Sequence, residues 1–316
     1  MPPPLIIDCD PGIDHAVSLL YAARRLAPIA VTTVHGNVAL ETATRNALAI
    51  LALGGIDLPV AAGCAAPLVA APRAASFVHG ESGLDGAVLP APSAAPLAQH
   101  AVDLLIEQAA AHRGALVVAA LGPLTNLAVA LRREPRLVDW IALVSAMAGS
   151  RGMGNMTPVA EFNVWSDPEA AAIVFGSGLR VRMIGYDLTR QIGFAEPELA
   201  VLERGGAAAR AVAGLYRHFL ARQRALWGLP VAPVHSPCAV VPLARPELVG
   251  YRPMPVAVEL AGRHTRGMTV TDARGFVAPP GPPFETLPAG GRCEVAVAAE
   301  GPAIVAELLA ALADDG

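Results

Sequence analysis

The sequence predicts an α/β protein with a mostly parallel central sheet, helices on both faces of that sheet, and small additional strands near the C-terminus. Two observations carry this prediction. Short apolar runs of strand length alternate with runs of helical period, which produces right-handed crossovers between parallel strands. Hydrophobic residues make up 54% of the 316 residues and charged residues 16%, so the chain can bury a large core. Because no repeat or linker is visible, we expect residues 1–316 to form one domain.

The elements of the first half follow from this alternation. Leu5-Ile6-Ile7 is a short apolar run that ends at Asp8, and the segment after it has apolar residues at helical spacing. The next run is β-branched throughout its second half, which favours a strand. We expect strands at residues 5–7, 29–34, 59–62, 115–121, 140–146 and 179–184. We expect helices at residues 14–26, 41–53, 98–111, 125–131 and 168–175.

The last part of the chain has a different pattern. From about residue 256 short strands are expected at 256–260, 268–271 and 293–298, before a final helix at 302–312. Two long stretches, 63–96 and 148–165, are expected to be loops, and long loops in a compact domain usually carry function. Parallel sheets bind ligands beyond the carboxyl ends of their strands. We therefore look for a site in residues 8–14, 35–37, 121–126 and 147–163.

Composition excludes several classes of protein. A net charge of -4 argues against a nucleic-acid or anionic membrane surface. The sequence has no lysine, which excludes Schiff-base and pyridoxal-phosphate chemistry and also the P-loop. Four scattered cysteines (Cys9, Cys64, Cys238 and Cys293) form no metal or disulfide pattern and indicate free thiols. With no signal peptide and no membrane span visible, we expect a cytoplasmic protein.

The strongest local motif is an acidic cluster at the end of the first expected strand. It reads Asp8-Cys9-Asp10-Pro11-Gly12-Ile13-Asp14-His15, with a turn at Pro11-Gly12 and Asp14 at the start of a helix. Three converging carboxylates repel one another unless a cation or a shared proton relieves them, so the cluster predicts a site. A purely structural cluster, in which Asp14 caps the helix and the others brace the turn, is the alternative.

The same Asp-x-Asp motif occurs in phosphotransferases of the haloacid dehalogenase type. Those enzymes need a hydroxyl residue two positions after the second aspartate and a basic residue, usually lysine, near the phosphoaspartate. Here the first position is Gly12 and the chain contains no lysine. We reject that assignment.

The acidic cluster resembles the signature of the nucleoside hydrolase family, the inosine-uridine-preferring N-ribohydrolases. Further segments resemble that family in the same order and at similar spacing over nearly the whole chain. They are His35-Gly36-Asn37, Thr44-Arg45-Asn46-Ala47, residues 79–86, Leu121-Gly122-Pro123-Leu124-Thr125-Asn126, Asn155, residues 158–163, residues 167–171, residues 265–270 and Asp272.

The resemblance implies hydrolysis of the N-glycosidic bond of ribonucleosides to ribose and free base, in purine or pyrimidine salvage. It also implies one Ca²⁺ at the floor of the pocket. Asp10 would be a metal ligand and the base that takes the proton of the attacking water, with Asp8 behind it. Leu121 would offer its backbone carbonyl to the metal. His235 would lie near the leaving base as a proton donor, because protonation makes the base easier to expel.

The family's substrate contacts map onto residues of this chain in the same way. Asp14 and Asn163 would hold the ribose 2′-hydroxyl, and Asn155 and Glu161 the 5′-hydroxyl. Carboxylates around the sugar would stabilise its oxocarbenium-like transition state. For the histidines, a buried and purely structural role is the alternative. The expected substrate-binding residues are Asp14, Asn37, His79 (at the base end), Asn155, Glu161, Phe162, Asn163 and Ser236.

Two positions depart from the family pattern, and both are calcium ligands in the family. The family has Asp-Asp where this chain has Asp14-His15, and His-Asp-Pro where it has His235-Ser236-Pro237. Calcium takes about 6 to 8 oxygen ligands. Because an imidazole and a neutral hydroxyl replace two anionic ligands here, we expect the affinity for Ca²⁺ to fall steeply. Three alternatives remain open: hydrolysis with weak or no Ca²⁺, recruitment of Zn²⁺ or Mn²⁺ by His15, and a catalytically impaired nucleoside- or sugar-binding protein or a hydrolase of another N-glycoside.

Base preference is not readable from the sequence. The family sets it on segments that correspond to residues 73–78 and to a helix at 211–227. An ordinary amphipathic helix is an equally good interpretation of the second segment. The residues considered for base contact are Tyr216, His218, Phe219, Gln223 and Trp227. The resemblance also implies a homodimer or homotetramer with a small-molecule nucleoside as its partner.

Overall fold

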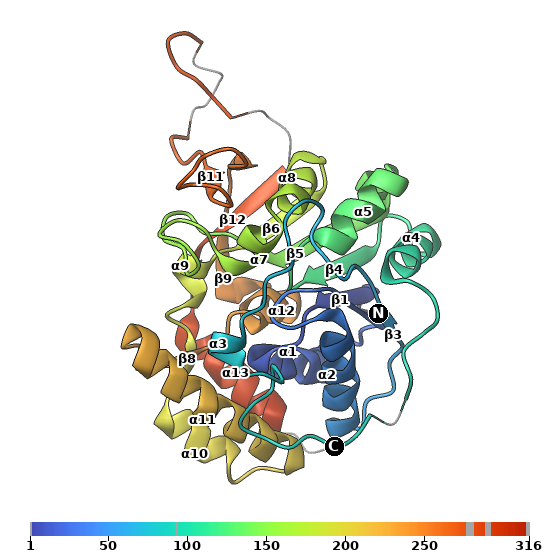
Figure 1. Ribbon diagram of the computed structural model, residues 1–316, viewed down its shortest axis with the longest axis vertical. Coiled ribbons are helices and arrows are strands. Elements are labelled where there is room, and N and C mark those ends of the chain that lie inside the picture. Colours follow the sequence, from blue (N-terminus) through green and yellow to red (C-terminus); the bar gives the residue numbers. More distant parts are fainter. Residues whose placement is uncertain (1, 93, 276–280, 288–291, 314–316) are drawn as a thin grey trace.

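The protein is built around one large sheet. The computed structural model describes residues 2–92, 94–275, 281–287 and 292–313 (Figure 1). Seven parallel strands and one antiparallel edge strand make up the sheet, which confirms the predicted fold class. Their order across the sheet is β3 (Val60–Ala62), β2 (Ala30–Thr33), β1 (Leu5–Cys9), β4 (Leu116–Ala120), β5 (Ile141–Met147), β6 (Arg180–Ile184), β12 (Arg292–Ala299) and the antiparallel β9 (Val249–Pro253).

Helices cover both faces of this sheet, as the sequence predicts. Successive side chains of a strand point to opposite faces, and in β1 Leu5 and Ile7 enter one core cluster while Ile6 enters the other. The cluster of Leu5 and Ile7 contains residues of α1 (Ile13–Arg25), α2 (Leu40–Leu53), α11 (Ala207–Trp227), α12 (Pro237–Ala244) and α13 (Gly301–Ala313). The cluster of Ile6 contains residues of α4 (Ala101–Ala111), α5 (Thr125–Arg133) and α8 (Pro168–Gly176) (Figure 1).

Helix starts are fixed by side chains that accept hydrogen bonds from free backbone amides. The predicted helix at 98–111 begins at Ala101, because the Nδ1 atom of His100 accepts from the amide of Val102 at 3.2 Å. Helix α8 begins at Pro168, where Asp167 accepts from the amide of Ala170 at 3.0 Å. Capping of this kind fixes the residue at which the helix begins.

Three expectations about the chain's organisation were wrong. The expected loops 63–96 and 148–165 contain the short helices α3 (Ser76–His79) and α7 (Phe162–Ser166). The strand expected at 293–298 is not a small additional strand, because β12 pairs with β6 and lies inside the central sheet. Among the strands expected near the C-terminus, β10 (Val256–Val258) and β11 (Thr269–Thr271) alone form a separate antiparallel pair.

Other elements were not predicted at all. They are α6 (Leu137–Trp140), α9 (Tyr186–Thr189), β7 (Gly193–Phe194), α10 (Glu196–Leu202), β8 (Ala232–Pro233), α12, a 3₁₀ turn at Pro246–Leu248, and the edge strand β9. Most of them are shorter than the window in which a hydrophobic period can be recognised. In the part of the chain that the structure describes, no helix is long and apolar enough to cross a membrane.

The fold brings several loops to one edge of the sheet. Strands β1, β2, β4 and β5 are parallel neighbours, so the residues that follow them meet beyond their carboxyl ends. Asp10 follows β1, Asn37 follows β2 and Leu121 follows β4. Met147 is the last residue of β5.

Candidate active site

A cavity lies at this edge of the sheet. The loops after β2 and β4 and the end of β5 with its loop contribute to it, together with the first turn of α1, with α3, α7, α9 and α11, and with the residues just before α12. Asp8 and Asp10 are fully buried and do not line it. The predicted site residues that do line it are Asp14, His15, Asn37, His79, Leu121, Asn155, Glu161, Phe162, Asn163, His235 and Ser236.

Asp10 is held rigidly at the end of β1. Its Oδ2 atom accepts from the backbone amide of Asn37 at 2.6 Å, and the Asn37 side chain donates to the Asp10 carbonyl at 3.3 Å. A Cβ atom at Gly36 would lie 2.0 Å from this carboxylate, so this close approach requires a glycine. Its Oδ1 atom is buried and faces the ring of His15. Burial raises the pKa of Asp10 above its ordinary value, which makes the carboxylate a stronger base.

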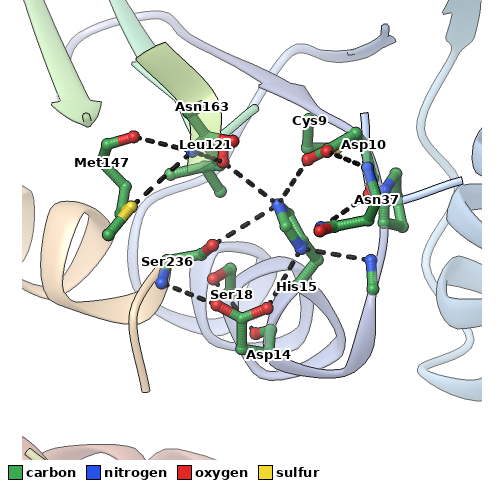
Figure 2. Close-up of polar contacts among 12 residues, drawn as sticks. Cys9, Asp10, Asp14, His15, Ser18, Asn37, Leu121, Met147, Asn163 and Ser236 are labelled. Carbon is green, nitrogen blue, oxygen red and sulfur yellow. Dashed lines mark hydrogen bonds and ion pairs between the residues drawn. The ribbon is translucent and has the colours of Figure 1, made fainter. Parts of the chain in front are cut away.

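His15 lies on the first turn of α1 between two carboxylates (Figure 2). Its Nε2 atom is 3.2 Å from Asp10 Oδ1, and its Nδ1 atom is 3.3 Å from Asp14 Oδ1. Burial alone would lower the pKa of this ring, but Asp14 and Asp10 outweigh it and raise the pKa to about 10. The two carboxylates thus favour the protonated form of the ring, while the backbone amide of Gly12 also donates to Nδ1 at 3.2 Å.

Asp14 faces the cavity next to this ring. Its Oδ2 atom accepts from the backbone amide of Ser236 at 2.8 Å, which joins α1 to the start of α12. Burial opposes ionisation, but the neighbouring charge of His15 holds the pKa of Asp14 well below its ordinary value. Asp14 is thus a permanently ionised carboxylate in the cavity wall.

Asp8 braces the strands behind the site. Its Oδ1 atom accepts from the hydroxyl of Thr32 at 2.6 Å and from the side-chain amide of Asn126 at 2.7 Å. These contacts connect β1 with β2 and α5. Its Oδ2 atom is buried without a partner, and burial raises the pKa of Asp8 from 3.8 to about 6.

The opposite wall is built by the start of α7. Glu161 caps this helix, accepting from the amide of Asn163 at 2.9 Å, and its other oxygen accepts from the amide of Gly149 at 2.9 Å. Burial raises the pKa of Glu161 to about 7 despite these bonds. The side-chain amide of Asn163 donates to the carbonyls of Leu121 and Met147, at 3.0 and 2.8 Å. This wall therefore joins the ends of β4 and β5.

Asn155 contributes an unused acceptor to the same cavity. Its Oδ1 atom is buried and has no hydrogen-bond partner. Buried polar atoms are nearly always paired, so this oxygen suits a donor on a bound ligand.

Two histidines, His79 and His235, also line the cavity. Burial lowers the pKa of His79 and of His235 to about 4, so both rings are neutral at pH 7. Nδ1 of His79 accepts from the amide of Ile13 at 3.3 Å, which places the ring proton on Nε2. His235 Nδ1 lies 2.8 Å from Thr189 Oγ1. A lowered pKa makes His235 a weaker proton donor than the sequence suggests, because the sequence does not reveal its burial.

Helix α11 supplies part of the rim. Of the five residues considered for base contact, Phe219, Gln223 and Trp227 line the cavity. Tyr216 does not line it and packs its ring against Phe194, with ring centroids 4.8 Å apart. His218 also lies outside the lining.

Sequence reasoning missed three lining residues. Tyr186 follows the carboxyl end of β6, where the strand-end rule could have found it, and Met147 at the end of β5 lay in the range searched but was not singled out. Met156 lies in the expected loop 148–165, but no pattern singled it out.

Comparison with known proteins assigns the fold and the site to one class of enzyme. The model of the inosine-uridine preferring nucleoside hydrolase family matches residues 5–304. A pyrimidine-specific ribonucleoside hydrolase RihA of Shewanella woodyi is 41% identical over 278 residues, which are 86% of this chain and 89% of that protein. The corresponding protein of Enterobacter sp. (strain 638) is 42% identical over 277 residues, 85% of this chain and 88% of its own.

Solved structures agree with these relatives. A plant nucleoside hydrolase superposes with a TM-score of 0.92 at 30% identity, covering 99% of this chain and 100% of its own. A purine-preferring ribonucleoside hydrolase from Gardnerella vaginalis superposes with a TM-score of 0.89 at 28% identity, covering 98% of each chain.

The chain belongs to the inosine-uridine preferring nucleoside hydrolase family. It is an N-ribohydrolase, an enzyme that cleaves the N-glycosidic bond of ribonucleosides, as the sequence predicts. The family uses a divalent metal ion. Among the described residues, however, no group of three or more His, Cys, Asp or Glu side chains is arranged to hold one.

Proposed function

We propose that the protein hydrolyses ribonucleosides with Asp10 as the base and with an altered dependence on metal. The convergence of Asp14, Asn155, Glu161 and Asn163 on one cavity carries this proposal. These side chains offer carboxylate and amide oxygens to sugar hydroxyls, and ionised carboxylates stabilise positive charge as it develops on the ribose.

The surroundings of Asp10 support its role as the base. Burial raises its pKa, which gives the carboxylate the basicity to take a proton from water. Asp10 does not line the cavity itself, but Oδ1 lies 3.2 Å from the ring of His15, which does.

The neutral state of His235 changes the role proposed for it. A ring with a pKa near 4 is almost wholly unprotonated at pH 7 and is a weak source of protons in the free enzyme. We propose that His235 orients the leaving base by a hydrogen bond. In the cavity it stacks near Tyr186, with ring centroids 5.5 Å apart.

We also propose a preference for pyrimidine ribonucleosides. The relatives that are 41 and 42% identical to this chain are described as pyrimidine-specific, whereas the purine-preferring solved structure is 28% identical. The catalytic efficiency, kcat/KM, on uridine and cytidine relative to inosine and guanosine tests this preference. An equal or higher value for inosine would contradict it.

The proposed roles of the two carboxylates are tested by Asp10→Asn and Asp14→Asn. Loss of the base lowers kcat by roughly 10²–10⁴-fold, and we expect this of Asp10→Asn with little change in KM. We expect Asp14→Asn to raise KM, because it weakens the hold on the ribose. Asp57→Asn, an exposed position, is the matched control. An Asp10→Asn enzyme that keeps wild-type kcat would remove Asp10 from the mechanism.

A further inference from the structure

The positions that hold the metal in this family are occupied differently here. The resemblance assigns the ion to Asp10, to the carbonyl of Leu121 and to two aspartates whose places are taken by His15 and Ser236. In the structure all four positions still meet at one point, and the group at that point is the ring of His15 (Figure 2). This ring is 2% exposed and fixed at the start of α1.

A single atom, Nε2 of His15, makes the contacts that the ion would make. It lies 3.2 Å from Asp10 Oδ1, 3.3 Å from the Leu121 carbonyl oxygen and 3.4 Å from Ser236 Oγ. The first two partners are acceptors only, so Nε2 carries its hydrogen in both the neutral and the charged ring. A ring nitrogen must lose its hydrogen to bind a metal ion. Nε2 is therefore turned to acceptors and not toward a metal.

The oxygen atoms around the ring are largely engaged as well. A carbonyl oxygen has two lone pairs, and that of Leu121 is contacted by His15 and by the side-chain amide of Asn163. Oδ2 of Asp10 accepts from Asn37, and Oδ2 of Asp14 accepts from Ser236. Too few oxygen ligands remain for a hard cation that needs about six or more.

We propose that the imidazole of His15 takes the place of the family's divalent ion, so that this protein has no resident metal. The ring lies between Asp10 and Asp14, 3.2 Å from one carboxylate and 3.3 Å from the other, and so fills the space between them from within the chain. Ser236 is part of the same replacement. Its small hydroxyl leaves space for the ring of His15, whereas an aspartate at this position would occupy part of that space. The inference deepens the proposed function. It rests on that function only where enzyme activity is measured, because metal binding is measured independently of activity.

The experiment compares wild type with the double variant His15→Asp/Ser236→Asp, which restores both carboxylates. Elemental analysis of the purified proteins and titration calorimetry with Ca²⁺, Zn²⁺ and Mn²⁺ measure metal directly. We expect substoichiometric metal in the wild type and unchanged kcat/KM after EDTA treatment. For the double variant we expect one bound Ca²⁺ per chain, with a dissociation constant at least about a hundredfold below that of the wild type.

The neutral double variant His15→Asn/Ser236→Asn is the matched control, because it opens similar space without adding charge. It should gain no Ca²⁺ site. Stoichiometric metal in the wild type, or loss of its turnover in EDTA, overturns the inference, whichever ion is found. A folded His15→Asp/Ser236→Asp protein that binds no Ca²⁺ overturns it too, and if that variant fails to fold the wild-type measurements still decide. Absence of turnover on every ribonucleoside would contradict the proposed function and leave the metal measurements valid.

Discussion

Asp8 shows how burial of one carboxyl makes the stability of the protein depend on pH. Burial raises its pKa from 3.8 to about 6, which corresponds to about 3 kcal/mol. The folded state therefore binds a proton more tightly than the unfolded state does. The contribution to stability is fully present below pH 3.8 and is lost as the pH rises through about 6.

Asp8→Asn should remove this pH dependence while keeping the oxygen that accepts from Thr32 and Asn126. The free energy of unfolding of the variant should rise relative to wild type by roughly 1–2 kcal/mol between about pH 5 and pH 8. Urea unfolding in EDTA at several pH values measures it, with Asp57→Asn as the exposed control. A difference that does not change with pH would show that Asp8 has an ordinary pKa.

We expect the ionisation of Glu161 to determine how kcat/KM falls at low pH, on the acid limb of the pH profile. Its carboxylate must be ionised to stabilise positive charge on the ribose, and burial raises its pKa to about 7. The value of kcat/KM should therefore fall as the pH drops below about 7. In Glu161→Gln the activity should be lower and this limb should be absent, whereas the exposed Glu81→Gln should keep it. A limb that persists near pH 7 in Glu161→Gln would assign it to another group.

The residue types of the site could be predicted from the sequence, but their contacts could not. The motif around Asp10 and the loop that contains Glu161 lead to one cavity, as strand-end placement suggests. The direction of the His15 ring depends on the turn at Gly12 and on Ser236, which is more than 200 residues away in the chain. Burial, which decides the pKa of His235, also arises from the packing of distant segments.

At the scale of single elements, helix α8 depends on its cap. Asp167 is fully buried, with Oδ1 accepting from the amide of Ala170 and Oδ2 accepting from the Thr125 hydroxyl at 2.7 Å and the Leu68 amide at 3.0 Å. One carboxylate thus joins α8, α5 and the segment after β3.

Asp167→Ala leaves three donors unpaired, of which those of Thr125 and Ala170 are buried, and we expect it to lower the free energy of unfolding by roughly 2–4 kcal/mol. Asp167→Asn keeps one acceptor and should lose less. Chemical denaturation gives both values, and Asp57→Ala is the control on the exposed surface. A loss no larger than that of the control would mean that solvent replaces these bonds.

Long elements could be predicted and short ones could not, for a physical reason. Helices such as α1 and α11 contain several turns, so the spacing of their apolar residues is visible in the sequence. Helices α3 and α7 have four and five residues and depend on caps and neighbours more than on period. Glu161 caps α7 in the structure, but glutamate is not one of the usual N-cap residues, so the sequence carries no clear signal for this helix.

At the scale of the whole molecule, the C-terminal segment completes a sheet that the N-terminal half begins. Strand β12 lies between β6 and β9, and α13 packs on α1, the helix that starts with the site residues. Arg24 of α1 donates to the carbonyl of Ala311, and the Tyr21 hydroxyl donates to Glu307 at 3.3 Å. The pairing of strands so distant in sequence could not be predicted, because strand-length runs carry no information about their partners.

This arrangement predicts a change in stability without a change in chemistry. Ile304, Leu308 and Leu312 of α13 are fully buried, and at about 1.5–3 kcal/mol each they contribute roughly 5–9 kcal/mol. That is comparable with the whole stability of an ordinary domain, about 5–15 kcal/mol, so a chain that ends before residue 292 should not fold.

Leu308→Ala should lower the free energy of unfolding by roughly 2–5 kcal/mol and leave kcat on the preferred ribonucleoside unchanged, because Leu308 does not line the cavity. Thermal unfolding and steady-state kinetics on the same preparation test both halves, with the exposed Ala306→Ser as control. A parallel fall in kcat at temperatures where the variant is fully folded would mean that α13 holds α1, and with it His15, in its working position.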